Sequence, residues 1–427
     1  MNTEELLLYR DARMLGIMKN MVALMEGPEE ASSHLVCRTA GDLLELAVSH
    51  GFYGNLWHCY LAYVLANHEN TFSKTCEIRG RVEGSINLFA RHDLELFLEL
   101  FHYDIASLDS KYRTNLFAGL ADYKDSGQNS RIFNKRIRQS ICRLGEELAQ
   151  ARDVEQSLST VTEFYRECGV GKLGLHKAFR IGREDETGIV QPITNIEHIY
   201  LKDLVGYEMQ KKKLIANTEA FVEGRKANNC LLFGDSGTGK SSSIKALLNE
   251  YYDRGLRMIE VYKHQFHQLP AVISEIKDRN YRFIILMDDL SFEDFEIEYK
   301  YLKAVIEGGL EKKPDNVLIY ATSNRRHLIR EKFSDKRELS DDLHENDTVQ
   351  EKLSLVSRFG VQIYYGAPEK KEFQEIVRVL ADRYGIDMPE EELLLEANRW
   401  ELSHGGLSGR TATQFIHHLA GRSSAAR

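Results

Sequence analysis

Apolar residues recur at intervals of three and four along the first 180 positions, most clearly in residues 6–22 and 94–101. This spacing places apolar side chains on one face of an α-helix, so the segment is typical of a series of amphipathic helices. Proline, which interrupts helices, is almost absent from it. We therefore predict an all-α N-terminal domain over residues 1–180.

The pattern changes after residue 199, where short apolar runs alternate with helical stretches. Strands and helices that alternate in this way predict a parallel sheet with helices on both faces, and we assign residues 199–366 to this α/β domain. Residues 169–194 are richer in glycine and charge, which is typical of a linker or β-turn segment, and we assign residues 181–198 to a linker. Helical spacing returns over 367–427, which predicts a small three-helix lid. The expected strands are 228–233, 256–261, 282–287, 317–321 and 361–364.

Two groups of side chains in the helical domain each allow two interpretations. Aromatic residues within 52–63 could line a groove for a ligand or peptide, but their spacing is more typical of core packing. Basic residues within 131–143 could contact nucleic acid or an acidic partner, but we favour a solvated helix face. The aromatic residues are Phe52, Tyr53, Trp57, Tyr60 and Tyr63, and the basic residues are Arg131, Lys135, Arg136, Arg138 and Arg143.

Composition narrows the class of protein. A chain of 427 residues is long enough for two or three domains, and its formal net charge of −9 gives no overall attraction to nucleic acid or anionic membranes. The six cysteines have no zinc-binding spacing, and we expect them to be reduced. The acidic N-terminus does not resemble a signal peptide, and the longest apolar stretch, 56–66, is too short to span a bilayer. We therefore expect a cytoplasmic protein without a membrane segment.

A glycine-rich segment lies between the predicted strand at 228–233 and a helical pattern that begins at residue 242. Its sequence has the form G-x-x-x-x-G-K-S of a phosphate-binding P-loop, which requires a strand before it and a helix after it. The glycines let backbone N–H groups approach the β-phosphate, Lys240 supplies a mobile cation, and the Ser241 hydroxyl is placed to bind Mg²⁺. The predicted nucleoside triphosphate site comprises Gly234, Asp235, Ser236, Gly237, Thr238, Gly239, Lys240 and Ser241.

Two further apolar strands end in polar residues. One is followed by Asp288 and Asp289, and the other leads to Asn324, at the sheet edge that carries the P-loop. We predict that Asp288 binds Mg²⁺, usually through water, and that Asp289 polarises the attacking water. Asn324 is expected to orient water near the γ-phosphate. The alternative for the two aspartates is an N-cap and a solvated neighbour, which a strand end downstream of a P-loop favours less.

The P-loop, the acid-ended strand and the asparagine-ended strand together resemble the AAA+ ATPases. This resemblance implies that Asn324 is the first sensor. Residues 204–208 resemble the segment of that family that lies against adenine, which implies contacts from Val205 and Gly206. Residues 357–360 resemble the motif with an arginine finger, and residues 405–410 resemble the second sensor of the lid. The resemblance thus implies that Arg358 reaches the γ-phosphate held by a neighbouring subunit and that Arg410 reports the nucleotide state to the lid.

A narrower resemblance is to an uncharacterised bacterial family of AAA+ proteins, domain of unknown function 815. It is carried by residues 203–208, 288–292, 346–354 and 408–410. The resemblance implies ATP and Mg²⁺ as cofactors. It also implies a homo-oligomeric ring, because a finger that acts on a neighbouring subunit has nothing to reach in a monomer.

Two positions depart from the AAA+ pattern. Asp289 stands where the family has a catalytic glutamate, so the water can be held farther from the γ-phosphate and hydrolysis is expected to be slow. Glu293 or Glu296 could substitute for it. Ser357 stands where an aspartate is common before the arginine finger, which weakens the match at Arg358.

These features predict an ATPase that couples Mg-ATP binding and hydrolysis to remodelling of an unidentified protein partner held by the helical domain. The alternative indicated by Asp289 is an ATP-gated switch or binding module with slow or absent hydrolysis. A DNA or helicase loader is indicated by the basic residues within 131–143 and 325–327, although the negative net charge disfavours nucleic acid. A simple kinase is disfavoured because it usually lacks an arginine finger and a sensor-bearing lid.

Overall fold

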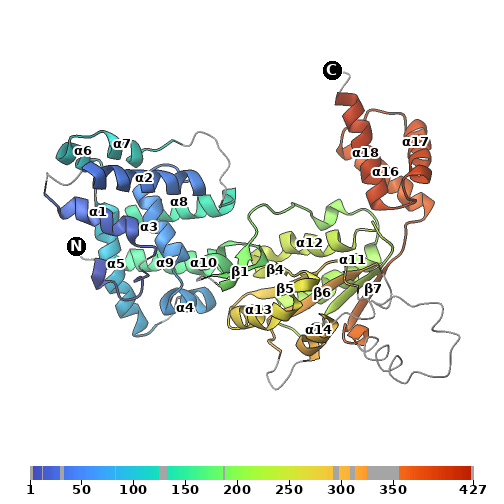
Figure 1. The fold of residues 1–427 in the computed structure, drawn as a ribbon, viewed down its shortest axis with the longest axis horizontal. Helices are drawn as coiled ribbons and strands as arrows, with labels where there is room; N and C mark the ends of the chain where they lie inside the picture. Colours follow the sequence, from blue (N-terminus) through green and yellow to red (C-terminus); the bar gives the residue numbers. More distant parts are fainter. Residues whose placement is uncertain are drawn as a thin grey trace. The chain divides into compact units, whose positions relative to one another are not determined.

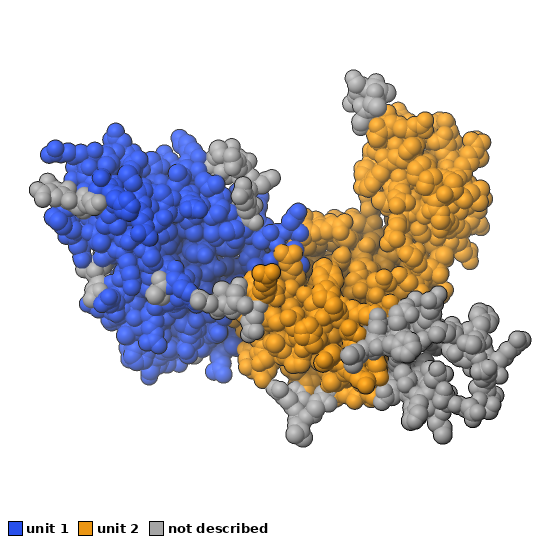
Figure 2. Space-filling view, viewed as in Figure 1, with its two compact units in different colours: residues 1–177, 192–195 blue, residues 178–191, 196–427 orange. Residues whose placement is uncertain are grey.

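The computed structural model of the chain describes residues 3–11, 13–28, 33–81, 83–124, 132–185, 188–291, 298–307, 313–324 and 355–424. The chain forms two compact units, which Figure 2 distinguishes by colour. The first comprises residues 1–177 and 192–195, and the second comprises residues 178–191 and 196–427. Among the described residues, no helix combines the length and the apolar character needed to cross a membrane.

The first unit is all-α, as predicted. A short 3₁₀ turn over Thr3–Glu5 precedes the helices, and α3 (Leu56–Asn67) lies at the centre of the unit, where nine of its twelve residues are buried. The side chain of Asn55 caps the N-terminus of α3 by accepting the N–H groups of Trp57 and His58. The other helices are α1 (Gly16–Glu26), α2 (Ser33–His50), α4 (Thr71–Arg79), α5 (Ile86–His102), α6 (Ser107–Tyr112), α7 (Leu116–Ala121), α8 (Lys135–Ala149), α9 (Val154–Cys168) and α10 (Gly171–Leu175).

Most of the aromatic residues between positions 52 and 63 pack in this core. Phe52, Trp57 and Tyr60 are at most 2% exposed. The indole N–H of Trp57 donates to the carbonyl of Leu100 at 2.8 Å, so its polar atom is satisfied inside the core. Core packing is therefore confirmed for these three residues, while Tyr53 is exposed.

The basic stretch lies mainly on α8. Arg143 is exposed and pairs with Glu147 and Glu167 at 3.7 and 3.9 Å, as a residue on a solvated helix face would. Arg136 donates instead to the backbone carbonyl of Leu175. Arg131 lies outside the described residues.

A fully buried carboxylate fixes the segment that precedes α1. Asp93, on α5, accepts the backbone N–H groups of Leu7, Leu8 and Tyr9 at 2.9, 2.7 and 3.0 Å. The residue has no exposed surface, so these three donors replace the water that its side-chain oxygens would otherwise bind. Asp93 therefore helps to attach this segment to the helical core, together with Tyr9, whose hydroxyl lies 2.8 Å from that of Tyr165.

Replacing Asp93 with alanine should destabilise the helical unit by about 3–5 kcal/mol, because three N–H groups lose a charged acceptor. The chain has two tryptophans, so in a Trp400→Phe background the fluorescence of Trp57 reports this unit alone during urea unfolding. Glu99→Ala is the matched control, because Glu99 is exposed on the same helix. Equal unfolding midpoints for the two variants would show that Asp93 does not hold the segment.

The second unit is built on a seven-stranded sheet in the order β2-β1-β4-β5-β6-β3-β7. The pairings β1–β4, β4–β5, β5–β6, β6–β3 and β3–β7 are parallel, which confirms the predicted sheet. The strands are β1 (Ala178–Asp185), β2 (Gly188–Pro192), β3 (Cys230–Gly234), β4 (Leu256–Glu260), β5 (Arg282–Met287), β6 (Val317–Ser323) and β7 (Val361–Tyr365).

The interpretation of residues 181–198 as a linker is wrong for its first half. Strands β1 and β2 extend the sheet there, and β1 pairs with β4 from Ala178 to Arg180. Phe179 and Ile181 are buried on one side of β1, while Arg180 between them is exposed. This alternation is that of a strand with one covered face. The α/β unit therefore begins about 20 residues earlier than the sequence indicated.

Helices cover both faces of the sheet, with α11 and α12 on one side and α13 and α14 on the other (Figure 1). The C-terminal lid has an apolar core of its own, to which all three of its helices contribute, including Phe373, Ala397 and Phe415. These helices are α11 (Glu208–Val222), α12 (Lys240–Tyr251), α13 (Leu269–Ile276), α14 (Glu298–Glu307) and, in the lid, α16 (Lys370–Arg383), α17 (Glu390–Ser403) and α18 (Gly409–Ser424).

Candidate functional site

The candidate site lies where three neighbouring strands end. Strand β6 pairs in parallel with β5 on one side and with β3 on the other. Phe233 lies opposite Ser323, and Met287 lies opposite Ala321, so the residues that follow these strands emerge at one edge of the sheet. The structure thereby brings the P-loop, the two aspartates and the asparagine together, as predicted.

The backbone conformation of the P-loop favours glycine at three positions, and at one of them there is also no room for a side chain. Gly234, Gly237 and Gly239 have φ values of 132°, 74° and 88°, which disfavour other residues. A Cβ on Gly234 would lie 2.1 Å from the backbone oxygen of Tyr365, so β7 leaves no room for one. At Gly239, by contrast, no described atom other than those of the adjoining residues lies within 4 Å of the corresponding Cβ position. The loop is thus packed tightly against β7 at its start and is open where α12 begins.

Replacing Gly234 or Gly239 with alanine should therefore reduce the stability of the protein by different amounts. Gly239→Ala introduces only the strain of a left-handed alanine, about 1–2 kcal/mol. Gly234→Ala adds a clash with backbone that cannot yield, so it should destabilise the protein clearly more. Thermal unfolding followed by circular dichroism compares the two variants. A smaller loss of stability in Gly234→Ala than in Gly239→Ala would contradict the geometry.

Lys240 is the first residue of α12, and its amine is held inside the loop. Nζ donates to the carbonyls of Gly234 and Asp235 at 3.0 and 2.5 Å and to Oδ1 of Asn324 at 3.0 Å. The residue is only 6% exposed, and burial lowers the pKa of its amine below the usual value. These acceptors are carbonyl and amide oxygens. An anionic phosphate oxygen would bind the charged amine more strongly than they do.

The polar residues at the strand ends form a connected hydrogen-bond network. Ser241 Oγ donates to Asp288 Oδ1 at 2.5 Å, and Thr322 Oγ1 donates to the same oxygen at 2.6 Å. Asn324 Nδ2 donates to Asp289 Oδ1 at 2.8 Å, while the Oδ1 of Asn324 faces Lys240. Ser241 is therefore joined to Asp288, and Asn324 joins Lys240 to Asp289. Sequence reasoning named all of these residues except Thr322.

A cavity of about 630 Å³ opens beside this network, within the range typical of small-molecule sites. Val205 and Gly206 line it, as the resemblance implied, and Ile376 and Leu380 add apolar surface from α16. The P-loop contributes residues 236–241. The cavity thus combines an apolar portion that suits a flat nucleobase with a polar portion rich in N–H groups. Lining residues that the sequence did not indicate include Asp203, Lys211, Thr413 and Gln414.

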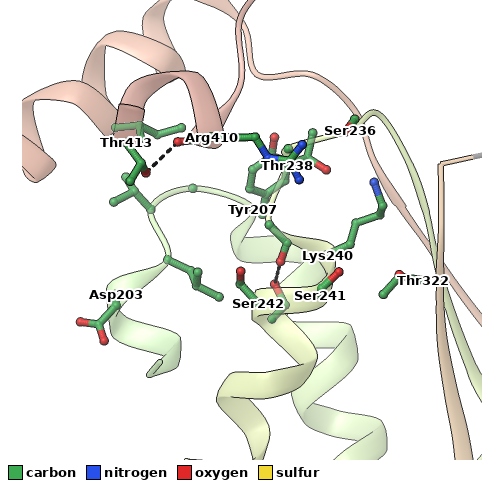
Figure 3. A pocket seen from close by; sticks show the side chains of 18 of the residues that line it. Asp203, Tyr207, Ser236, Thr238, Lys240, Ser241, Ser242, Thr322, Arg410 and Thr413 are labelled. Carbon is green, nitrogen blue, oxygen red and sulfur yellow. Dashed lines mark hydrogen bonds between the residues drawn. The ribbon is translucent and has the colours of Figure 1, made fainter. Parts of the chain in front are cut away.

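The lid closes one side of the cavity. Figure 3 shows the side chain of Arg410 extending from the start of α18 toward the P-loop residues Ser236 and Thr238. The backbone N–H of Arg410 donates to the carbonyl of Gly237 at 3.2 Å. A Cβ on Gly237 would lie only 3.1 Å from that of Arg410, so loop and lid are in close contact. Arg410 is therefore placed next to the phosphate-binding loop, where its predicted role requires it.

Three predicted site residues, Gly234, Asp235 and Arg358, do not line the cavity. The carboxylate of Asp235 accepts the backbone N–H of Ala367 at 2.7 Å, which attaches the P-loop to the segment that leads into the lid. Arg358 forms an ion pair with Glu307 of α14 at 2.6 Å. Arg358 therefore lies outside the cavity of its own chain, as a residue that acts on a neighbouring subunit would. Its role at a neighbouring subunit stays a prediction. The alternative bases Glu293 and Glu296 and the basic residues 325–327 lie outside the described residues.

The residues present fit a magnesium nucleotide. Among the residues that the structure describes, no group of three or more His, Cys, Asp or Glu side chains could hold a metal. Mg²⁺ at nucleotide sites is usually bound by one or two carboxylates, water and the phosphates themselves. Asp288 with the Ser241 hydroxyl, beside a loop with a buried lysine, is a donor set of this kind.

Comparison with known proteins places the chain in a family. A family model described as "Protein of unknown function (DUF815)" matches residues 175–423. The chain belongs to this family. Its second unit has the architecture expected from the sequence, a parallel sheet covered by helices and followed by a helical lid. Among curated proteins, no sequence matches this chain.

Two solved structures of other proteins show a distant likeness to the chain. The Thermotoga maritima RuvB Holliday junction branch migration motor is 16% identical with a TM-score of 0.39, over 53% of this chain and 66% of that one. The FIGL-1 AAA domain in complex with ADP is 17% identical with a TM-score of 0.38, over 54% of this chain and 76% of that one. These identities and TM-scores are too low to indicate an activity. The activity is therefore inferred from the residues of the site.

Proposed function

We propose that this protein is a Mg²⁺-dependent ATP hydrolase. The observation that supports the proposal best is the single network at the ends of β3, β5 and β6. In it Asn324 links Lys240 to Asp289, Ser241 bonds to Asp288, and Thr322 joins the two groups, through hydrogen bonds of 2.5–3.0 Å beside one cavity. Three strand ends separated by many residues in sequence contribute to it, and each contributes a group that triphosphate chemistry needs.

Each residue then has a distinct task. The Lys240 amine exchanges its loop carbonyls for phosphate oxygens, and the backbone N–H groups of the P-loop at the start of α12 bind further phosphate oxygens. Ser241 and Asp288 hold the metal, which supplies charge neutralisation at the phosphates. Asp289 polarises a water molecule for attack, and Asn324 fixes the direction of that carboxylate through its amide. Val205 and Gly206 contact the adenine ring.

The arginines extend the proposal to an assembly. Arg410 senses the nucleotide from the lid of its own chain, since α18 already contacts the P-loop. Arg358 acts on the nucleotide of a neighbouring copy, after exchanging Glu307 for the γ-phosphate. A head-to-tail contact of this kind forms a ring when the rotation between neighbouring copies closes, which is the assembly we propose. The helical unit, with a core separate from that of the ATPase unit, would hold a protein partner that the cycle remodels.

The second candidate is a switch that binds ATP and hydrolyses it slowly or not at all. The observation that favours it is Asp289, whose carboxylate is one methylene shorter than that of glutamate and already bonds to Asn324. The two candidates differ in one measurable quantity, the number of ATP molecules turned over per chain.

Purified protein should release phosphate from ATP over many cycles when Mg²⁺ is present, and Lys240→Ala should reduce the rate to background because the phosphates lose their cation. Lys245→Ala is the control, since Lys245 lies on the same helix but does not line the cavity. Phosphate release followed with a coupled assay measures both. Turnover limited to one cycle in the wild type would favour the switch, and equal rates for Lys240→Ala would contradict hydrolysis at this site.

The neighbouring-subunit role of Arg358 can be tested by mixing two inactive variants. Lys240→Ala cannot bind nucleotide but retains Arg358, whereas Arg358→Ala binds nucleotide but lacks the finger. In randomly mixed rings about a quarter of the sites combine an intact loop with an intact neighbouring arginine, so activity should return to about that fraction of the wild-type rate. A mixture as inactive as its components, despite co-assembly seen by size-exclusion chromatography, would rule out action in trans.

A further inference from the structure

Thr322 forms hydrogen bonds with both Asp288 and Asp289, although the sequence did not indicate it as a site residue. It is the second-last residue of β6, is 2% exposed and lines the cavity. Its Oγ1 donates to Asp288 Oδ1 at 2.6 Å and accepts the backbone N–H of Asp289 at 2.9 Å. A hydroxyl has one hydrogen to donate, and the N–H can only donate, so the direction of both bonds is fixed.

Asp289 has a backbone conformation that needs such support. Its φ is 52°, in the left-handed region that residues with a side chain adopt infrequently. Thr322 holds the turn at two points, because its carbonyl also accepts the N–H of Leu290 at 2.7 Å. The left-handed turn bends the chain directly after β5. In that conformation the short carboxylate of Asp289 reaches the amide of Asn324.

We propose that Thr322 is a positioning residue for ATP hydrolysis and that its single hydroxyl group sets the orientation of both aspartates. This inference rests on the proposed function. Thr322 restrains Asp288 through its side chain and Asp289 through its backbone, so the metal-binding carboxylate and the water-polarising carboxylate keep a fixed relation to each other. A carboxylate shorter than glutamate depends on this restraint, because it has fewer rotatable bonds with which to correct a misplaced backbone.

The effect expected on removing the hydroxyl is on the chemical step. In Thr322→Val the shape is retained, but Asp288 loses a donor and the Asp289 N–H loses its acceptor. A displacement of about 1 Å in a reacting group lowers rates by about 100-fold, so kcat should fall by about 10- to 100-fold. The KM for ATP should change little, because the P-loop, Lys240 and the adenine contacts are untouched.

The test compares kcat, KM, the affinity for a non-hydrolysable ATP analogue and the unfolding midpoint in four proteins. They are the wild type, Thr322→Val, Thr322→Ser and Thr218→Val. Serine keeps the hydroxyl and should restore most of kcat. Thr218→Val is the matched control, because Thr218 is a fully buried threonine of the same unit whose hydroxyl bonds to Tyr320 and the Leu214 carbonyl, away from the cavity.

A loss of kcat in Thr322→Val with unchanged analogue affinity, rescue by serine and no loss in Thr218→Val would support the inference. Wild-type kcat in Thr322→Val would overturn it while leaving the proposed hydrolase intact. A loss of kcat that merely follows the loss of stability, and is not rescued by serine, would also overturn it, because Thr322 would then have only a structural role. Absence of turnover in the wild type would instead refute the proposed function from which the inference starts.

Discussion

Backbone pairing among β5, β6 and β3 is the constraint on which the rest of the site depends. The three strands run parallel in a fixed register, so the residues that follow them reach one edge of the sheet. A slip of two residues in β6, which is buried along its whole length, would move Asn324 by about 6.6 Å, at about 3.3 Å per residue. Its bonds to Lys240 and Asp289 would then be lost. The backbone pairing that fixes the strand register therefore also sets the geometry of the polar network.

The P-loop is in turn connected to both ends of the lid. Asp235 at its start accepts a hydrogen bond from Ala367, ahead of the first lid helix, and Gly237 in its middle contacts Arg410 on the last lid helix. When Lys240 releases the carbonyls of Gly234 and Asp235, the conformation of the loop would change. This change would alter both contacts between the loop and the lid. This arrangement gives a direct physical route from phosphate binding to lid position, which an ATP-driven cycle requires.

The parts of this structure that could be predicted from sequence are those set by local signals. The P-loop is a contiguous motif, and the central strands β3, β5 and β6 are short apolar runs whose bounds differ little from those expected. Strands β1 and β2 were missed because their surroundings are rich in glycine and charge. The partner that makes β1 a strand is β4, almost 80 residues further along the chain. Similarly, nothing near Thr322 in sequence indicates that its hydroxyl bonds to Asp288, and nothing near Arg358 indicates its pairing with Glu307.

The central claim is that one ATP binds each chain at the loop that contains Lys240. Isothermal titration of the purified protein with a non-hydrolysable ATP analogue tests it most directly. The account predicts binding with a stoichiometry of about one per chain, tighter with Mg²⁺ than with EDTA and abolished in Lys240→Ala. Binding that is absent, or that persists unchanged in the Lys240→Ala variant, would contradict it.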